Sequence, residues 1–278
     1  MQAFAAAEKF VDVVGARVRY IEAGSGSPML LLHGLGHSST SWRRVIPGLC
    51  ASHRVIALDL PGFGGSDAPA DAAYDPDYFA RVVEAAVGAL SLGRVDAVGH
   101  SAGGLTLLID ALRSPSRYRR LVLVDPAGFT PAPDNLLGTA AASLARLLVS
   151  IPRNRALTRA LYSTAFYDSR CVDEETVDEL VKRGSNATQK VAVRRAFAKY
   201  FDFCRRLEPF HERIASLEAP MFVIWGSDDR LFRTSDSAVA KRVLRDVRIE
   251  LFERCGHCPQ IENPQKFVAA VSEFLALP

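Results

Sequence analysis

Short runs of apolar residues alternate with longer mixed stretches over the first 130 residues of the chain. Two β-branched runs on either side of Gly15-Ala16 predict an opening hairpin. The later runs are apolar at nearly every position, which is the pattern of strands that are buried on both faces of a parallel sheet. Helical patterns over about 78–90 and 102–112 separate the last of them, so the rhythm predicts an open α/β sheet. The predicted strands cover residues 11–14, 18–21, 29–32, 55–58, 95–98 and 121–124.

The alternation stops after Asp125-Pro126, and from residue 131 to about residue 213 the pattern is only helical. Residues 136–151 carry a single charge, so a helix there is apolar on nearly every face and must be covered. The strand pattern returns at residues 221–225 and 247–252, and a last helix is predicted over about 264–275. We therefore predict an α/β core, residues 1–130 and 214–278, interrupted by an all-helical cap, residues 131–213.

Composition places the chain among ordinary globular proteins. Its 278 residues are 49% apolar and 23% charged, and no apolar run approaches the roughly 18 residues of a membrane span. The first nine residues lack the basic flank and the apolar stretch of a secretory signal, so we expect a cytoplasmic protein without a membrane span.

The charge distribution excludes one class of partner and favours another. The chain has 34 basic and 31 acidic side chains, a net charge of +3, which is far from the basic footprint of a nucleic-acid-binding protein. Residues 131–213 hold 14 basic and 10 acidic side chains, an excess of +4 that would attract an anionic substrate.

The five cysteines are odd in number and scattered, which argues against a disulfide framework. Cys255-Gly256-His257-Cys258 has the spacing of a metal or redox pair, but the chain offers no second pair of ligands. We therefore expect no metal site.

Gly99-His100-Ser101-Ala102-Gly103 places a serine directly between an apolar strand and an apolar helix. A serine at such a turn is held in a strained conformation that raises its hydroxyl above the sheet, and the small residues on either side make the turn possible. The helix that follows directs backbone amides at developing negative charge. This context predicts that Ser101 is a nucleophile.

A serine nucleophile needs a base and a carboxylate that orients the base. His257 lies between a late strand and the last helix, at the same edge of the predicted sheet as Ser101. Three carboxylates follow predicted strands and could serve as the acid: Asp125, Asp228 and Asp229. We expect His33 to be structural and the remaining histidines to be ordinary polar residues, namely His37, His53, His100 and His211.

The stretch Leu32-His33-Gly34-Leu35-Gly36-His37 follows another predicted strand. Its two glycines allow a tight turn that brings a backbone amide towards the serine. The amides of Leu35 and Ala102 together predict a two-donor oxyanion hole.

These segments, together with Asp59-Leu60-Pro61-Gly62-Phe63-Gly64-Gly65-Ser66 and Trp225-Gly226-Ser227-Asp228-Asp229, resemble the α/β-hydrolase fold superfamily over essentially the whole chain. The resemblance implies that the acid is the third residue after the glycine of the tryptophan-glycine pair, which maps to Asp229 ahead of Asp228 and Asp125. It also implies that the helical insertion is a cap. The serine at position 101 argues against the haloalkane dehalogenase and epoxide hydrolase branches, which have aspartate there.

The resemblance implies a serine hydrolase without a metal or organic cofactor, acting on a small-molecule substrate, and our main prediction is an apolar acyl ester cleaved through an acyl-enzyme. The alternative is carbon–carbon bond hydrolysis of the meta-cleavage product type, in which a cap arginine binds a dienoate carboxylate. Cys258-Pro259 argues against that alternative, because such enzymes commonly have tryptophan after the histidine. A third hypothesis is a non-catalytic ligand-binding protein, and the oligomeric state is not assigned. The cap arginines considered are Arg194, Arg195, Arg205 and Arg206.

Overall fold

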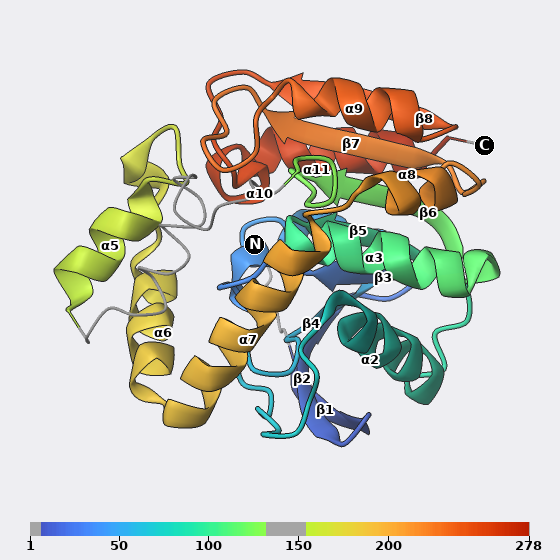
Figure 1. The fold of residues 1–278 in the computed structure, drawn as a ribbon. Helices are drawn as coiled ribbons and strands as arrows, with labels where there is room; N and C mark the ends of the chain where they lie inside the picture. The colour runs from blue at the N-terminus through green and yellow to red at the C-terminus, as the bar shows by residue number, and fades with distance from the viewer. Residues whose placement is uncertain (1–6, 132–153, 278) are drawn as a thin grey trace.

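The computed structural model describes residues 7–131 and 154–277 (Figure 1). Within them, eight strands form one sheet in the order β1-β2-β4-β3-β5-β6-β7-β8. The β1–β2 and β2–β4 pairs are antiparallel and the other pairs are parallel, so the predicted hairpin and α/β sheet are confirmed. The strands are β1 Ala7–Val13, β2 Ala16–Ala23, β3 Ser27–Leu32, β4 His53–Leu58, β5 Val95–His100, β6 Tyr118–Val124, β7 Met221–Gly226 and β8 Val247–Phe252.

Helices cover both faces of this sheet (Figure 1). Helices α2, Pro76–Ala89, and α3, Ala102–Arg113, pack on one face, while α1, Ile46–Leu49, and α11, Pro264–Leu275, pack on the other. Successive strand side chains point to opposite faces, so in β3 Leu30 joins one apolar cluster and Leu31 the other. This double burial explains why the central strands are apolar at every position.

Further helices connect or flank these elements. Helix α9, Asp236–Val243, packs on the same face as α2 and α3, and α10, Pro259–Glu262, follows the loop after β8. Two short 3₁₀ helices complete the core, η1 Ser39–Trp42 and η2 Pro115–Arg117.

Between β6 and β7 the described residues are helical and contain no strand. Asp173 caps α6 by accepting hydrogen bonds from the backbone amides of Glu175 and Thr176, as acidic residues commonly do at helix starts. The helices are α5 Arg155–Ser163, η3 Ser169–Cys171, α6 Glu174–Ser185, α7 Ala187–Phe203 and α8 Glu208–Ile214.

Helices α5, α6 and α7 lie on the side towards which the β7 arrow points in Figure 1. Tyr162, Phe166 and Val177 of this segment form a third apolar cluster with Cys258 and Ile261, so the segment packs on the loop that follows β8. The predicted apolar helix over residues 136–151 lies outside the described residues. No described helix is long and apolar enough to cross a membrane.

Candidate active site

Strands β5, β6, β7 and β8 are neighbours and run parallel, so their carboxyl ends meet at one edge of the sheet. Each is followed by a residue with a reactive or charged side chain. Ser101 comes directly after β5 and Asp125 directly after β6, while Asp229 and His257 lie in the loops after β7 and β8. The topology therefore gathers four such side chains from distant parts of the sequence.

Ser101 occupies the sharp turn that the sequence predicts. Its φ of 53° and ψ of −119° are unusual for a residue with a side chain and cost of order 1–3 kcal/mol. The turn is held because the Ser101 amide donates to the Val124 carbonyl at 2.8 Å and the Ser101 carbonyl accepts from the Ala127 amide at 3.0 Å. A Cβ on Gly103 would lie 2.4 Å from the Leu32 carbonyl oxygen, so the position after the elbow has room only for glycine.

The two predicted oxyanion donors flank this serine. Ala102 is the first residue of α3, and Leu35 lies in the loop after β3. A Cβ on the neighbouring Gly34 would be 2.9 Å from the Ser101 Cβ, which shows how closely that loop approaches the serine. Within the described residues neither amide donates to a protein acceptor, so both are available to a developing oxyanion.

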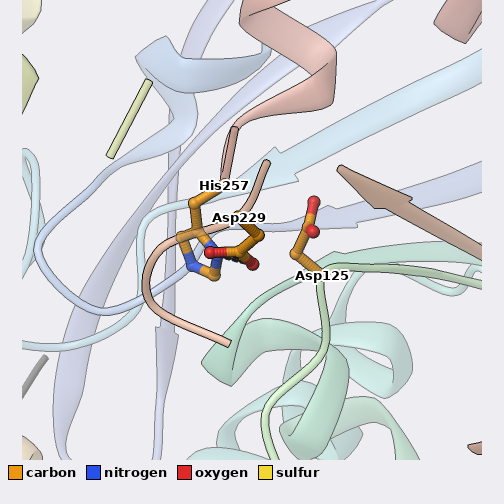
Figure 2. Close-up of side chains that lie close together, drawn as sticks. All are labelled: Asp125, Asp229 and His257. Carbon is orange, nitrogen blue, oxygen red and sulfur yellow. Dashed lines mark hydrogen bonds and ion pairs between the residues drawn. The ribbon is translucent and has the colours of Figure 1, made fainter. Parts of the chain in front are cut away.

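Asp229 and His257 form a direct pair (Figure 2). His257 Nδ1 lies 2.8 Å from Asp229 Oδ2, and both side chains are buried. The other carboxylate oxygen, Oδ1, accepts from the backbone amides of Leu231 at 2.7 Å and Phe232 at 3.1 Å. These contacts orient the carboxylate and leave His257 Nε2 as the ring nitrogen able to take a proton.

In the described part of the chain no hydrogen bond joins Ser101 Oγ to His257 Nε2. Such bonds are often long before substrate binds, so the geometry is compatible with a serine–histidine pair. The other two candidate acids are placed differently. Asp228 is exposed and accepts from Ser227 Oγ at 2.6 Å, whereas Asp125 is fully buried and accepts from the Gly226 amide at 2.9 Å.

The loop that carries His257 is tied to the helical segment. The His257 amide donates to the Ala165 carbonyl at 2.7 Å. Glu262 of α10 accepts from the Gly256 amide through one carboxylate oxygen and from the Tyr167 amide through the other, both at 2.8 Å. The position of His257 therefore depends on its contacts with the segment 165–168.

Two histidines expected to be ordinary polar residues are buried beside His257. The His100 ring lies 4.9 Å from the His257 ring and 5.4 Å from the His37 ring, centroid to centroid. His100 Nε2 lies 2.7 Å from the His257 carbonyl oxygen, so it donates a proton to that oxygen. Burial lowers the pKa of His37 to about 3 and lowers that of His100 as well, so both rings stay neutral.

His33 is structural, as expected. Its ring bonds the Gly34 carbonyl through Nδ1 at 2.8 Å and accepts from the Leu60 amide through Nε2 at 3.0 Å. This fixes the loop that contains Leu35. His211 also forms a hydrogen bond with the backbone, since its Nε2 lies 2.8 Å from the Gly128 carbonyl oxygen.

The four arginines considered for a substrate carboxylate are all exposed: Arg194, Arg195, Arg205 and Arg206. The buried arginine of the helical segment is instead Arg183, whose guanidinium donates to the carbonyls of Gly36 and His37. In the sequence Arg183 looked like a basic residue at the end of a helix, and only the packing of α6 on the loop after β3 reveals its position. Glu179, one turn earlier on α6, accepts from Ser38 Oγ at 2.8 Å in that same loop.

Asp125, Asp229 and His257 bring ligand-type atoms within 4.8 Å of one another, the one such group of three among the described residues. The short Asp229–His257 contact engages two of these atoms in a hydrogen bond, as a catalytic acid–base pair requires. Cys255 and Cys258 are both buried free thiols and lie outside this group.

Residues 29–271 match the model of the alpha/beta hydrolase family. The chain is 32% identical to the 2-hydroxymuconate semialdehyde hydrolase of Pseudomonas sp. (strain CF600), over 96% of this chain and 93% of that protein. It is 31% identical to the 2-hydroxy-6-oxo-2,4-heptadienoate hydrolase of Pseudomonas putida (strain F1), over 94% of each. A solved meta-cleavage product hydrolase from Pseudomonas fluorescens IP01 superimposes with a TM-score of 0.85 at 27% identity, over 96% of this chain and 97% of that chain.

The match to the family model spans most of the chain, and the named relatives align over more than nine tenths of it. The sheet order and the loops that follow β5 and β7 are consistent with this match. The chain belongs to the alpha/beta hydrolase family, with relatives of the meta-cleavage product hydrolase type.

Proposed function

We propose that this protein is a serine-type hydrolase that cleaves a carbon–carbon bond in a 2-hydroxy-6-oxo-dienoate. The substrate class rests on the relatives' names, a semialdehyde hydrolase and a heptadienoate hydrolase that align over nearly the whole chain. These names support the carbon–carbon alternative better than our main prediction from the sequence, an apolar acyl ester.

In this proposal Ser101 attacks the ketone carbon while His257 accepts the hydroxyl proton through Nε2. Asp229 holds the imidazole in the tautomer that leaves Nε2 free, through its 2.8 Å contact with Nδ1. The oxyanion formed at the ketone oxygen is stabilised by the Leu35 and Ala102 amides. Loss of the dienoate carbon fragment, protonated by the histidine, leaves an acyl-serine that water hydrolyses.

The position of Arg183 supports the proposal that the substrate is an anion. Its guanidinium is buried against the loop that carries Leu35, so a cation lies beside the proposed oxyanion donors. The guanidinium donates to two carbonyl oxygens and also lies over the Phe63 ring. A buried guanidinium can bind a carboxylate through charge-assisted hydrogen bonds. Burial lowers the pKa of Arg183, and the charge of Glu179, on the same helix, opposes this and favours the charged guanidinium.

The direct test is turnover of 2-hydroxy-6-oxo-2,4-heptadienoate by the purified protein, followed by the loss of the dienoate chromophore. A Ser101→Ala variant is the matched control, because it removes the nucleophile and keeps the elbow. We expect turnover by the wild type and a loss of several orders of magnitude in kcat in the variant. Equal turnover by both proteins would refute a serine mechanism, and a wild type that is inert toward the dienoate would refute the proposed substrate class.

A further inference from the structure

Asp125 is a buried carboxyl group that the proposed mechanism does not use. It follows β6 with a φ of 41°, an uncommon conformation for a residue other than glycine, and its side chain is fully buried. Oδ1 accepts from the Gly226 amide at 2.9 Å, at the end of β7. Oδ2 is buried and has no donor among the described residues. Asp125 therefore has an uncommon backbone conformation and one buried carboxyl oxygen that receives no hydrogen bond from the described residues, and it lies next to Asp229 and His257.

The surroundings of Asp125 oppose a negative charge. A carboxyl oxygen of Asp125 lies within 4.8 Å of Asp229 and of His257, and Glu262 of α10 adds a second nearby carboxylate. Burial raises the pKa of the Cys255 and Cys258 thiols, and the charge of Asp125 would raise it further, so these groups offer Asp125 no positive partner. No lysine or arginine among the described residues forms an ion pair with Asp125. Burial, followed by the charge of Asp229, raises the pKa of Asp125 well above its ordinary value.

Two carboxyl groups in contact can form a hydrogen bond only when one of them carries a proton. Asp229 already accepts two backbone amides on Oδ1 and His257 on Oδ2, which is the pattern of an ionised group. Asp125 has one backbone donor on Oδ1, so the proton belongs on its unpartnered Oδ2. Figure 2 shows the three side chains gathered at this point.

We propose that Asp125 is a positioning residue: a neutral carboxylic acid whose Oδ2–H donates to the Asp229 carboxylate and holds it against His257. This inference rests on the proposed triad. The Asp229 carboxylate then has a fourth donor, beside the Leu231 and Phe232 amides and His257. Because Asp125 also accepts from Gly226, one side chain links the ends of β6 and β7 to the acid that orients the base.

Two substitutions separate the donor role from mere packing. Asp125→Asn keeps an acceptor for the Gly226 amide and a donor for Asp229, whereas Asp125→Leu fills similar space with neither. We expect kcat of the asparagine variant to stay within about threefold of wild type. The kcat of the leucine variant should fall by roughly 10–100-fold with KM little changed, the range found when outer hydrogen-bond partners that orient a metal ligand are removed. Equal kcat in both variants would overturn the proposal.

A pH series with Asp125→Asn provides a second test that does not require the leucine variant to fold. At alkaline pH the wild-type Asp125 loses its proton, stops donating and repels Asp229, so wild-type kcat should fall while the asparagine variant keeps its activity. The ratio of variant to wild-type kcat at each pH removes any titration of the substrate, and it should rise at high pH. A ratio that stays constant from pH 6 to pH 10 would contradict the proposal.

Ser101→Ala, assayed beside these variants, keeps the two hypotheses distinguishable. Retained activity in the Ser101 variant would refute the proposed function itself. Loss of activity in that variant, together with an Asp125→Leu protein that is folded and fully active, would refute only the role of Asp125.

Discussion

Asp229→Asn is the substitution whose effect the geometry defines most sharply. In the wild type, Asp229 Oδ1 accepts the Leu231 and Phe232 amides, while Oδ2 meets His257 Nδ1. The single carbonyl oxygen of asparagine is required by the two backbone donors. Its NH₂ group must then face His257 Nδ1, which has to be unprotonated to accept from it.

The expected loss of kcat follows from that tautomer of His257. A ring with Nδ1 as acceptor carries its proton on Nε2, where it cannot take the proton of Ser101. The same substitution in the serine protease triad lowers kcat by about 10⁴, which corresponds to roughly 5 kcal/mol of transition-state stabilisation. We therefore expect a loss of about four orders of magnitude in kcat, with little change in the thermal midpoint.

The assay is steady-state turnover of the dienoate substrate, with Ser101→Ala setting the background. Asp228→Asn is the matched control, because Asp228 is the adjacent aspartate but its side chain is exposed and, within the described residues, hydrogen-bonds only to Ser227. That variant should retain kcat within about twofold, as is usual for a surface substitution. A loss of less than tenfold in Asp229→Asn, or a larger loss in Asp228→Asn, would refute the assignment of the acid.

Three further outcomes follow from single residues. Arg183→Ala should lower kcat/KM for the dienoate relative to a neutral ester by about 10-fold or more, as expected for a lost charge-assisted hydrogen bond, whereas exposed Arg194→Ala should leave that ratio unchanged. Glu262→Gln places an amide donor against a backbone amide and should lower the free energy of unfolding in urea by about 1–3 kcal/mol, with faster hydrogen exchange at Tyr167. Unchanged exchange there would contradict the role of Glu262 in holding the Tyr167 and Gly256 amides. Asp125 keeps a proton in the folded protein that the unfolded chain loses above about pH 4, so its raised pKa makes the wild type less stable as pH rises. The thermal midpoint of Asp125→Asn, measured relative to wild type, should therefore increase from pH 4 to pH 8. A difference in midpoint that does not change with pH would argue against a neutral Asp125.

Much of the sheet could be predicted because strands that are buried on both faces have apolar residues at consecutive positions in the sequence. Every position from Met29 to Leu32 lies in the core, and the prediction for that strand falls within β3. The apolar pattern is weaker at the beginnings of strands. β6 starts at Tyr118 and includes Arg119 and Arg120, which are only half-buried, and Arg119 donates to Asp96 of β5. An apolar pattern therefore detects only residues 121–124 of this strand.

The parts of the site on short turns could be predicted for a similar reason. The elbow at Ser101 needs small neighbours and a strand–helix junction, and these requirements are local in sequence. Contacts between distant segments leave no comparable pattern. Arg183 has the position of an ordinary helix-terminal charge, and nothing near it in the sequence indicates that its partners are the carbonyls of Gly36 and His37. The burial of His100 against His257 likewise joins the end of β5 to the loop after β8, two points that are 157 residues apart in the sequence.

The choice between a carbon–carbon bond and an ester is tested most directly by one comparison of specificity. We would measure kcat/KM for 2-hydroxy-6-oxo-2,4-heptadienoate and for p-nitrophenyl butyrate with the same preparation of wild-type protein. Recognition of the dienoate carboxylate by a buried cation is worth about 1.5–3 kcal/mol, so the account predicts a preference of roughly 10–100-fold or more for the dienoate. A higher kcat/KM for the butyrate ester would contradict it and would restore the esterase prediction made from the sequence.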